Sequence, residues 1–451
     1  MRIHFIAIGG SAMHNLAIAL HKKGFIVSGS DDLIFEPSAS RLSRFGIFPE
    51  KPGWHEELIT PDLDAVILGM HALTDNPELL RAQELGIKVY SYPEYIYEQT
   101  KDKLRVVIGG SHGKTTITSM ILHVLNYYEK DFDYLVGAQL EGFDTMVKVT
   151  DSAPLIIIEG DEYLASPIDR RPKFHLYKAN IAVISGVAWD HVNVFPTFEN
   201  YLHQFDLFID TIEEPGGKLF YCEKDKELHA LVGKSNKQIV KTGYEIPAHR
   251  VNNGITYLMP ENLPLKIFGD HNLMNLSAAK LVCKEIGVSE EDFNQAITSF
   301  KGAAKRLELL NTENNTNVYK DFAHSPSKLK ATIEAVKSQF EERKLVACIE
   351  LHTFSSLNKN FLLQYADTMI RADNPIVYID IKTFQQKKIK PFTEIDVRTA
   401  FNNDKLTFFD NASTLEQYLR GLNFDHANLL LMSSGNFGGM DLVKLARELN
   451  T

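Results

Sequence analysis

Residues 109–116, Gly-Gly-Ser-His-Gly-Lys-Thr-Thr, form the segment of this sequence with the clearest chemistry. They follow an apolar run at 106–108, typical of a strand, and precede a helical pattern at 117–125. In such a setting backbone N–H groups of a glycine loop can surround phosphate oxygens, Lys114 adds positive charge, and the Thr115 hydroxyl can bind Mg²⁺. Ile108 stands where a strict Walker A motif has glycine. The segment predicts a phosphate site, with a glycine-rich turn that only caps a helix as the alternative.

Two groups of polar residues follow other apolar runs in the same region. Glu159-Gly-Asp-Glu-Tyr comes directly after 156–158, and the Asp190-His191 pair comes after 181–184. Side chains at the carboxyl ends of parallel strands lie beside such a phosphate loop, where a hard cation needs oxygen ligands. Taken alone, the acidic group is as consistent with a solvated loop as with a metal site, and an isolated Asp-His pair is more often a loop pair. Together they predict a metal site that includes Glu159 and His191.

A second glycine turn lies at residues 7–12, Ala-Ile-Gly-Gly-Ser-Ala, between an apolar run at 3–8 and a helical pattern at 13–23. Asp31 follows about twenty residues later, after another apolar run. This arrangement resembles a dinucleotide-binding fingerprint with alanine at two glycine positions. It predicts a diphosphate at a helix N-terminus, which either NAD or a UDP-sugar could supply. Taken alone it suggests a nicotinamide-dependent dehydrogenase.

Strand-like and helical segments alternate along nearly the whole chain, which is typical of βαβ units with parallel sheets, so the predicted fold class is α/β. A polar segment at 98–103 precedes a new apolar strand, and a basic, glycine-containing connector occupies 301–306. The predicted domains are therefore 1–102, 103–305 and 306–451, which suits a chain of 451 residues.

The composition excludes several classes of protein. Hydrophobic residues make up 44% and charged residues 24%, which rules out a disordered, collagenous or coiled-coil chain. The formal charge of −10 argues against a nucleic-acid or anionic-membrane binder. Three cysteines without CxxC spacing indicate neither disulfides nor a thiolate zinc site, and no apolar run is long enough for a membrane span. We expect a cytoplasmic protein with no membrane insertion; the oligomeric state is left open.

The order of these motifs resembles that of the Mur ligases of peptidoglycan synthesis. Further segments extend the resemblance over essentially the whole chain: Gly-Asp-His-Asn-Leu-Met-Asn at 269–275, the linker at 300–306, and Tyr-Lys-Asp-Phe-Ala-His-Ser-Pro at 319–326. The resemblance implies a Rossmann-like N-terminal domain that binds a UDP-sugar, a central P-loop ATPase domain and a Rossmann-like C-terminal domain. It also implies ATP and Mg²⁺ as cofactors, and no nucleic acid as a partner.

The resemblance further implies roles for particular residues. Catalytic roles fall to Lys114, His191 and Arg306, and Mg²⁺ ligation to Thr115, Glu159 and His191. The implied ATP-binding residues are Gly110, Ser111, His112, Gly113, Lys114, Thr115, Thr116, Asn272, Asn275, Arg306 and Asp321. Those for the UDP-sugar are Gly9, Gly10, Ser11, Ser30, Asp31, Thr74 and Asn76, and those for a peptide substrate are His324, His352 and Ser434.

Two branches of the family share the dinucleotide-like first domain: the UDP-N-acetylmuramate:L-alanine ligases and the murein peptide ligases. Segments 159–174, 189–195 and 432–439 resemble the second branch, and 351–356 lacks the arginines found there in the first. The predicted reaction is ATP-dependent joining of UDP-N-acetylmuramate to L-alanyl-γ-D-glutamyl-meso-diaminopimelate, the murein tripeptide, in peptidoglycan recycling. The L-alanine ligase and a nicotinamide-dependent oxidoreductase are the alternatives.

The sequence also departs from the family pattern. Gly186 stands where relatives commonly have Asn, and Asn193 where they have Asp. No lysine occurs between His191 and Lys218, so we expect no carbamylated lysine at the metal site. No residue is assigned as the general base for the amine.

Overall fold

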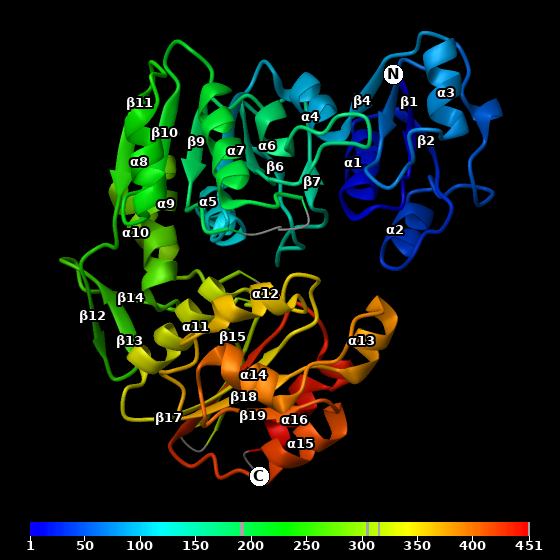
Figure 1. Ribbon diagram of the computed structural model, residues 1–451. Coiled ribbons are helices and arrows are strands. Elements are labelled where there is room, and N and C mark those ends of the chain that lie inside the picture. Colours follow the sequence, from blue (N-terminus) through cyan, green and yellow to red (C-terminus); the bar gives the residue numbers. More distant parts are fainter. Residues whose placement is uncertain (190–193, 304–305, 314–315, 450–451) are drawn as a thin grey trace. The chain divides into compact units, whose positions relative to one another are not determined.

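The computed structural model describes residues 1–189, 194–303, 306–313 and 316–449 (Figure 1). The chain forms two compact units, described separately here. The first comprises Met1–Val187, Glu199–Glu245 and Ala278–Glu290, and the second comprises Ala188–Phe198, Ile246–Ser277 and Glu291–Thr451. Helices alternate with mostly parallel strands in both, which confirms the predicted α/β class. The predicted boundaries at 102 and 305 stay predictions.

The N-terminal part of the first unit is a parallel sheet in the order β2-β1-β3-β4. Its strands are β1 (Arg2–Ile6), β2 (Ile26–Ser30), β3 (Ala65–Leu68) and β4 (Val89–Ser91), and its helices are α1 (Ser11–Lys22), α2 (Ser38–Arg44), α3 (Pro77–Glu84) and α4 (Tyr92–Thr100). Strand β1 ends at Ile6 because Ala7 adopts a positive φ of 66°, which begins the turn into α1. Because β1 and β2 are parallel and Ile6 lies opposite Ser30, the carboxyl ends of the two strands are neighbours.

A seven-stranded sheet in the order β11-β10-β9-β5-β8-β6-β7 forms the rest of the first unit. Its strands are β5 (Leu104–Gly109), β6 (Asp133–Leu135), β7 (Val147–Lys148), β8 (Leu155–Glu159), β9 (Ile181–Ile184), β10 (Lys218–Cys222) and β11 (Val240–Tyr244). Helices α5 (Lys114–Tyr127), α6 (Lys173–Leu176), α7 (Phe198–Asp210) and α8 (Lys226–Lys234) accompany them. Only β7 runs antiparallel among these strands. Strand β5 lies between β8 and β9, so the segments that follow all three strands meet at one edge.

The second unit contains a small antiparallel sheet, β12 (His249–Asn252), β13 (Ile255–Leu258) and β14 (Leu263–Leu265). Its larger sheet has the order β15-β16-β20-β17-β18-β19, with only β15 antiparallel. These strands are β15 (Glu308–Glu313), β16 (Thr316–Asp321), β17 (Lys344–Glu350), β18 (Asn374–Tyr378), β19 (Thr407–Phe409) and β20 (Ala427–Met432). Residues after β16, β20 and β17 therefore lie at one end of this sheet.

Helices cover both faces of the larger sheet, and buried aliphatic and aromatic side chains pack on each face. The helices that follow β16 in the chain are α11 (Pro326–Gln339), α12 (Lys359–Leu362), α13 (Ile381–Lys387), α14 (Glu394–Phe401), α15 (Ala412–Arg420) and α16 (Leu442–Glu448), and α9 (Asp270–Glu285) and α10 (Glu290–Ile297) precede it. No helix in the described part of the chain is long and apolar enough to cross a membrane.

Candidate functional site

The loop between β5 and α5 has the backbone geometry of a phosphate cradle. Gly110 and Gly113 have φ angles of 123° and 78°, which glycine adopts without strain. A Cβ added at Gly110 would collide with Ser185, which follows β9. The Ser111 N–H donates to the Gly186 carbonyl at 2.9 Å, so the loop is fixed against the neighbouring strand. The Ser111 hydroxyl is buried and has no hydrogen-bond partner in the described part of the chain, as expected of a donor that awaits a phosphate oxygen.

Lys114 begins α5 and forms an ion pair with Glu162 beyond β8. Its Nζ lies 2.7 Å from Glu162 Oε2 and donates to the Gly110 carbonyl at 2.5 Å. The Glu162 side chain is fully buried, and the Tyr201 hydroxyl donates to its other oxygen at 3.3 Å. Burial alone would lower the pKa of Lys114, but the carboxylates of Glu162, Asp161 and Glu159 outweigh it and raise the pKa. The ammonium is therefore held in its charged form within the loop.

Glu159 ends β8 next to the same loop. Its Oε1 accepts a hydrogen bond from Thr115 Oγ1 at 2.7 Å, and its Oε2 accepts one from the Gly137 N–H at 2.7 Å. A Cβ at Gly137 would lie 2.8 Å from Glu159 Oε1, so this approach needs glycine. One carboxylate and one hydroxyl are oxygen donors of the kind that Mg²⁺ uses together with water and phosphate. The predicted pair Thr115 and Glu159 thus lies together and fits Mg²⁺.

No other predicted acidic or metal-ligating residue that the structure describes contacts this pair. Asp161 forms an ion pair with Lys173 at 2.7 Å. Asp190 and His191 lie outside the described residues. Among the residues that are described, no group of three or more His, Cys, Asp or Glu side chains could hold a metal ion. Among the described residues, Glu159 is therefore the carboxylate that contacts the Thr115 hydroxyl directly.

The N-terminal glycine turn is held by Asp31, a contact that the fingerprint itself does not predict. The Gly9 N–H donates to Asp31 Oδ2 at 2.7 Å, and an added Cβ on Gly9 would lie 2.9 Å from that oxygen. Burial is the main reason that the pKa of Asp31 is raised, although the Gly9 hydrogen bond opposes the shift. Gly10 precedes α1, whose first residue is Ser11. A helix N-terminus with a glycine turn is suited to a diphosphate.

The other residues predicted to hold a UDP-sugar have varied surroundings. Ser30 is fully buried, with its hydroxyl 3.5 Å from His4 Nε2. The Asn76 side chain caps α3 by accepting hydrogen bonds from two backbone N–H groups of that helix. Thr74 is exposed in the preceding turn. Ser30 and Asn76 therefore have structural partners already, whereas Ser11 and Thr74 are accessible.

In the second unit, Asp321 ends β16 and joins the segments on either side of it. Its two oxygens accept hydrogen bonds from the N–H groups of Leu307 at 2.8 Å and Ala323 at 2.7 Å. The Arg306 guanidinium lies 4.7 Å from the centre of the Phe322 ring. Burial lowers the pKa of His271, and the Asp321 charge acts in the opposite direction. Asp321 and Arg306 both act electrostatically on His271, so the two residues lie in one neighbourhood of the second unit.

The two predicted asparagines lie on α9, which begins one residue before His271. Asn272 donates to the Phe268 carbonyl at 2.9 Å and so closes the first turn of this helix. Asn275 follows one turn later on the same helix. Asp321 acts electrostatically on His271, the residue before Asn272 on this helix.

Two of the three predicted peptide-binding residues come together at the carboxyl end of the larger sheet. Ser434 Oγ lies 3.4 Å from His352 Nε2. Beneath them Glu350 accepts hydrogen bonds from the Ser433 hydroxyl and, at 2.9 Å, from the Phe437 N–H. His324 follows β16 instead, where its Nδ1 lies 2.8 Å from the Phe322 carbonyl. His324 therefore follows the strand next to β20, at the same end of the sheet, and no hydrogen bond joins it to the pair among the described residues.

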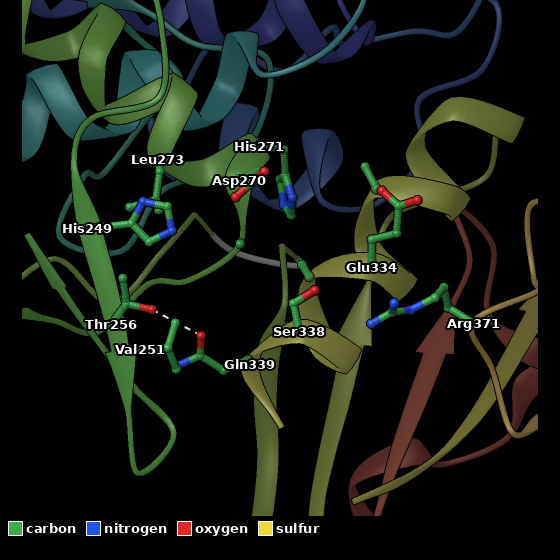
Figure 2. Close-up of a pocket in the computed structure, with 13 residues that line it drawn as sticks. His249, Val251, Thr256, Asp270, His271, Leu273, Glu334, Ser338, Gln339 and Arg371 are labelled. Carbon is green, nitrogen blue, oxygen red and sulfur yellow. Dashed lines mark hydrogen bonds between the residues drawn. The ribbon is translucent and has the colours of Figure 1, made fainter. Parts of the chain in front are cut away.

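A cavity of about 250 Å³ lies between the small sheet and α11 in the second unit. Figure 2 shows His249 on one side of it and Glu334 and Arg371 on the other, with a hydrogen bond of 3.0 Å from Thr256 to Gln339. Arg371 lines this cavity rather than the Ser434 and His352 pair.

Comparison with known proteins gives family matches to both predicted nucleotide-binding regions. The Mur ligase family, catalytic domain, matches residues 2–103, and the Mur ligase middle domain matches residues 108–283. The matches extend from the first glycine turn through the phosphate loop, Glu159 and the asparagines of α9.

Three similar proteins cover most of the chain. The UDP-N-acetylmuramate--L-alanine ligase of Caldicellulosiruptor bescii is 31% identical over 404 residues, which are 85% of each chain. A Haemophilus influenzae protein named UDP-N-acetylmuramate--L-alanyl-gamma-D-glutamyl-meso-2,6-diaminoheptandioate ligase is 29% identical over 347 residues, 75% of this chain and 76% of its own. The crystal structure of UDP-N-acetylmuramate-alanine ligase from Thermotoga maritima has a TM-score of 0.67 at 20% identity and covers 100% of this chain and 98% of its own. This last similarity concerns the fold.

Proposed function

The chain belongs to the Mur ligase family of ATP-dependent amide-bond ligases, and we propose that it joins UDP-N-acetylmuramate to L-alanyl-γ-D-glutamyl-meso-diaminopimelate in peptidoglycan recycling. The observation that carries the proposal is the loop of β5 and α5, where Lys114 and Glu162 form one charge pair and Thr115 and Glu159 form an oxygen-donor pair. A lysine that can contact the phosphates and oxygen donors that can hold Mg²⁺ are the groups that transfer of a phosphoryl group from ATP requires.

A carboxylate must be activated before an amine can attack it, because its oxygen is a poor leaving group. In the proposed reaction the lactyl carboxylate attacks the γ-phosphorus of ATP, the bond to the β-phosphate oxygen breaks, and ADP leaves. The neutral amine then attacks the acyl carbon and loses one N–H proton to solvent, while the C–O bond to phosphate breaks with its electron pair and phosphate leaves. Both substrates are cytoplasmic metabolites in this proposal, so we also propose a cytoplasmic location.

Residues of the phosphate loop are the proposed ATP contacts, with Lys114 on the β- and γ-phosphates. Mg²⁺ bound to Thr115 and Glu159 would neutralise phosphate charge. Arg306 is proposed to stabilise the transferring phosphoryl group, and Asp321 to bind the ribose. Asn272 and Asn275 are proposed to approach the adenine, and His191 stays a proposed metal or phosphate contact outside the described residues.

The glycine turn held by Asp31 is the proposed site of the UDP diphosphate. We expect Asp31→Ala to raise the KM for UDP-N-acetylmuramate about tenfold, because Gly9 loses a charge-assisted hydrogen bond that fixes the turn. The KM for ATP should stay unchanged, since ATP is bound elsewhere. Steady-state kinetics with each substrate varied checks this, and Asp32→Ala, at the exposed neighbour, is the control. Equal effects of both variants would remove Asp31 from the site.

The choice of the tripeptide as the amine rests on particular segments. Residues 159–174 and 432–439 resemble the murein peptide ligases, and residues 351–356 contain no arginine. The turn after β20 brings Ser434 to His352 above the buried Glu350, which gives a polar surface for a peptide at the sheet end. His324, on the neighbouring strand end, is the third proposed contact.

L-alanine is the alternative amine, and the similarity to the Caldicellulosiruptor bescii ligase favours it. A nicotinamide-dependent oxidoreductase loses its support, because the glycine turn at residues 7–12 lies within a Mur ligase family match. ADP release measured with UDP-N-acetylmuramate and each amine in turn tests the proposal. Release without any amine dependence would contradict it.

A further inference from the structure

Lys387 lies at the carboxyl end of the larger sheet and belongs to none of the motifs described above. It is the last residue of α13, the helix that follows β18 (Figure 1). Its Nζ lies 3.9 Å from the centre of the Phe354 ring. Phe354 itself is 67% exposed and lies two residues beyond His352. The lysine therefore belongs to the surface around His352 and Ser434.

No carboxylate among the described residues balances the charge of Lys387. Other lysines of this domain form ion pairs, as Lys337 does with Asp373 at 2.8 Å and Lys359 with Asp396 at 2.9 Å. Within the described residues no acidic side chain forms an ion pair with Lys387, whose pKa is lowered by partial burial. A partly desolvated ammonium without a counter-ion favours an anionic ligand.

The same charge reaches His352. Burial, the larger effect, lowers the pKa of this imidazole; the Glu350 carboxylate raises it, and the Lys387 ammonium lowers it. Glu350 and Lys387 thus act on His352 with opposite signs. Glu350 already accepts hydrogen bonds from Ser433 and Phe437, whereas the Lys387 ammonium contacts the Phe354 ring. Within the described residues no carboxylate pairs with Lys387, so a carboxylate of a ligand would complete this surface.

We propose that Lys387 binds a carboxylate of the incoming peptide, with Phe354 holding its side chain in place. The inference rests on the proposed function and names a specificity-determining residue of the same reaction. The peptide has free carboxylates beyond its reacting amine, and residues 351–356 offer no cation except a protonated His352. An ammonium–carboxylate hydrogen bond is among the stronger polar contacts, so its loss has a measurable effect.

Lys387→Ala should raise the KM for the tripeptide about tenfold or more. The kcat and the KM values for ATP and UDP-N-acetylmuramate should change less than twofold, by roughly the size of ordinary surface effects. Lys387→Arg should retain most of the affinity for the tripeptide. Lys382→Ala, an exposed lysine on the same helix, is the matched control and should behave like the unaltered enzyme.

A second arm identifies the group that Lys387 binds. A tripeptide analogue with carboxamides in place of its carboxylates should be a weak substrate for the unaltered enzyme and no weaker for Lys387→Ala. An unchanged KM for the natural tripeptide in Lys387→Ala, or an equal further loss with the analogue, would overturn the inference. Failure of the unaltered enzyme to use any amine would instead refute the proposed function and this inference with it.

Discussion

Lys114→Ala is expected to abolish turnover while UDP-N-acetylmuramate still binds. The ammonium of Lys114 is the positive charge of the phosphate loop, and its loss should lower kcat by roughly a hundredfold or more. The UDP-sugar is proposed to bind at the N-terminal glycine turn, so its affinity should change little. Single-turnover ADP formation and calorimetric titration with UDP-N-acetylmuramate give the two readouts. Unaltered turnover would refute the phosphate site.

The ion pair with Glu162 makes a stability control necessary for this variant. Removing one partner of a buried pair costs about 3 kcal/mol, so Lys114→Ala should also lower the melting temperature. The double variant Lys114→Met with Glu162→Gln removes both charges and should regain much of that stability. It should remain inactive, because it still lacks the phosphate-binding charge. A double variant that is both stable and active would show that Lys114 serves the fold rather than the reaction.

Glu159→Gln is expected to lower kcat roughly a hundredfold and to raise the Mg²⁺ concentration needed for half-maximal rate. The substitution keeps the shape of the side chain, but it replaces one of the oxygens that contact Thr115 and Gly137 by an amide nitrogen and removes the charge. Initial rates over a Mg²⁺ titration measure both effects.

The matched control for Glu159 is Asp161→Asn. Asp161 follows the same strand, but its carboxylate pairs with Lys173 and not with the loop hydroxyl. Its Mg²⁺ dependence should therefore stay close to that of the unaltered enzyme. A titration that shifts for Asp161→Asn and not for Glu159→Gln would place the metal on the other carboxylate.

The elements around the phosphate loop were predictable, but their ends were not. The expected helix at 117–125 is observed as Lys114–Tyr127. It begins earlier because polar residues Lys114, Thr115 and Thr116 form its first turn, where no apolar periodicity marks the start. Similarly the expected strand at 3–8 ends at Ile6, since Ala7 takes a left-handed conformation. Local turn geometry of this kind leaves little trace in hydrophobic pattern.

The partners within the site were less predictable than its motifs. Glu162 lies 48 positions from Lys114 and Gly137 lies 22 positions from Glu159, so no spacing along the chain reveals either contact. They arise because β6 and β5 flank β8 in the sheet. The contact between Lys387 and Phe354 was unpredictable for the same reason, since the two residues follow different strands. Sequence motifs indicate which side chains can take part in the reaction, whereas the order of strands in the sheet determines which side chains contact one another.

The most direct test of the proposed function is a competition between the two amines in one reaction. The enzyme, ATP, Mg²⁺ and UDP-N-acetylmuramate are mixed with equal concentrations of L-alanine and L-alanyl-γ-D-glutamyl-meso-diaminopimelate. Mass spectrometry at low conversion then gives the ratio of the two products, which equals the ratio of their kcat/KM values. We predict that UDP-N-acetylmuramyl-tripeptide predominates by at least about tenfold, which corresponds to roughly 1.4 kcal/mol of discrimination. Predominance of UDP-N-acetylmuramyl-L-alanine would contradict the proposal.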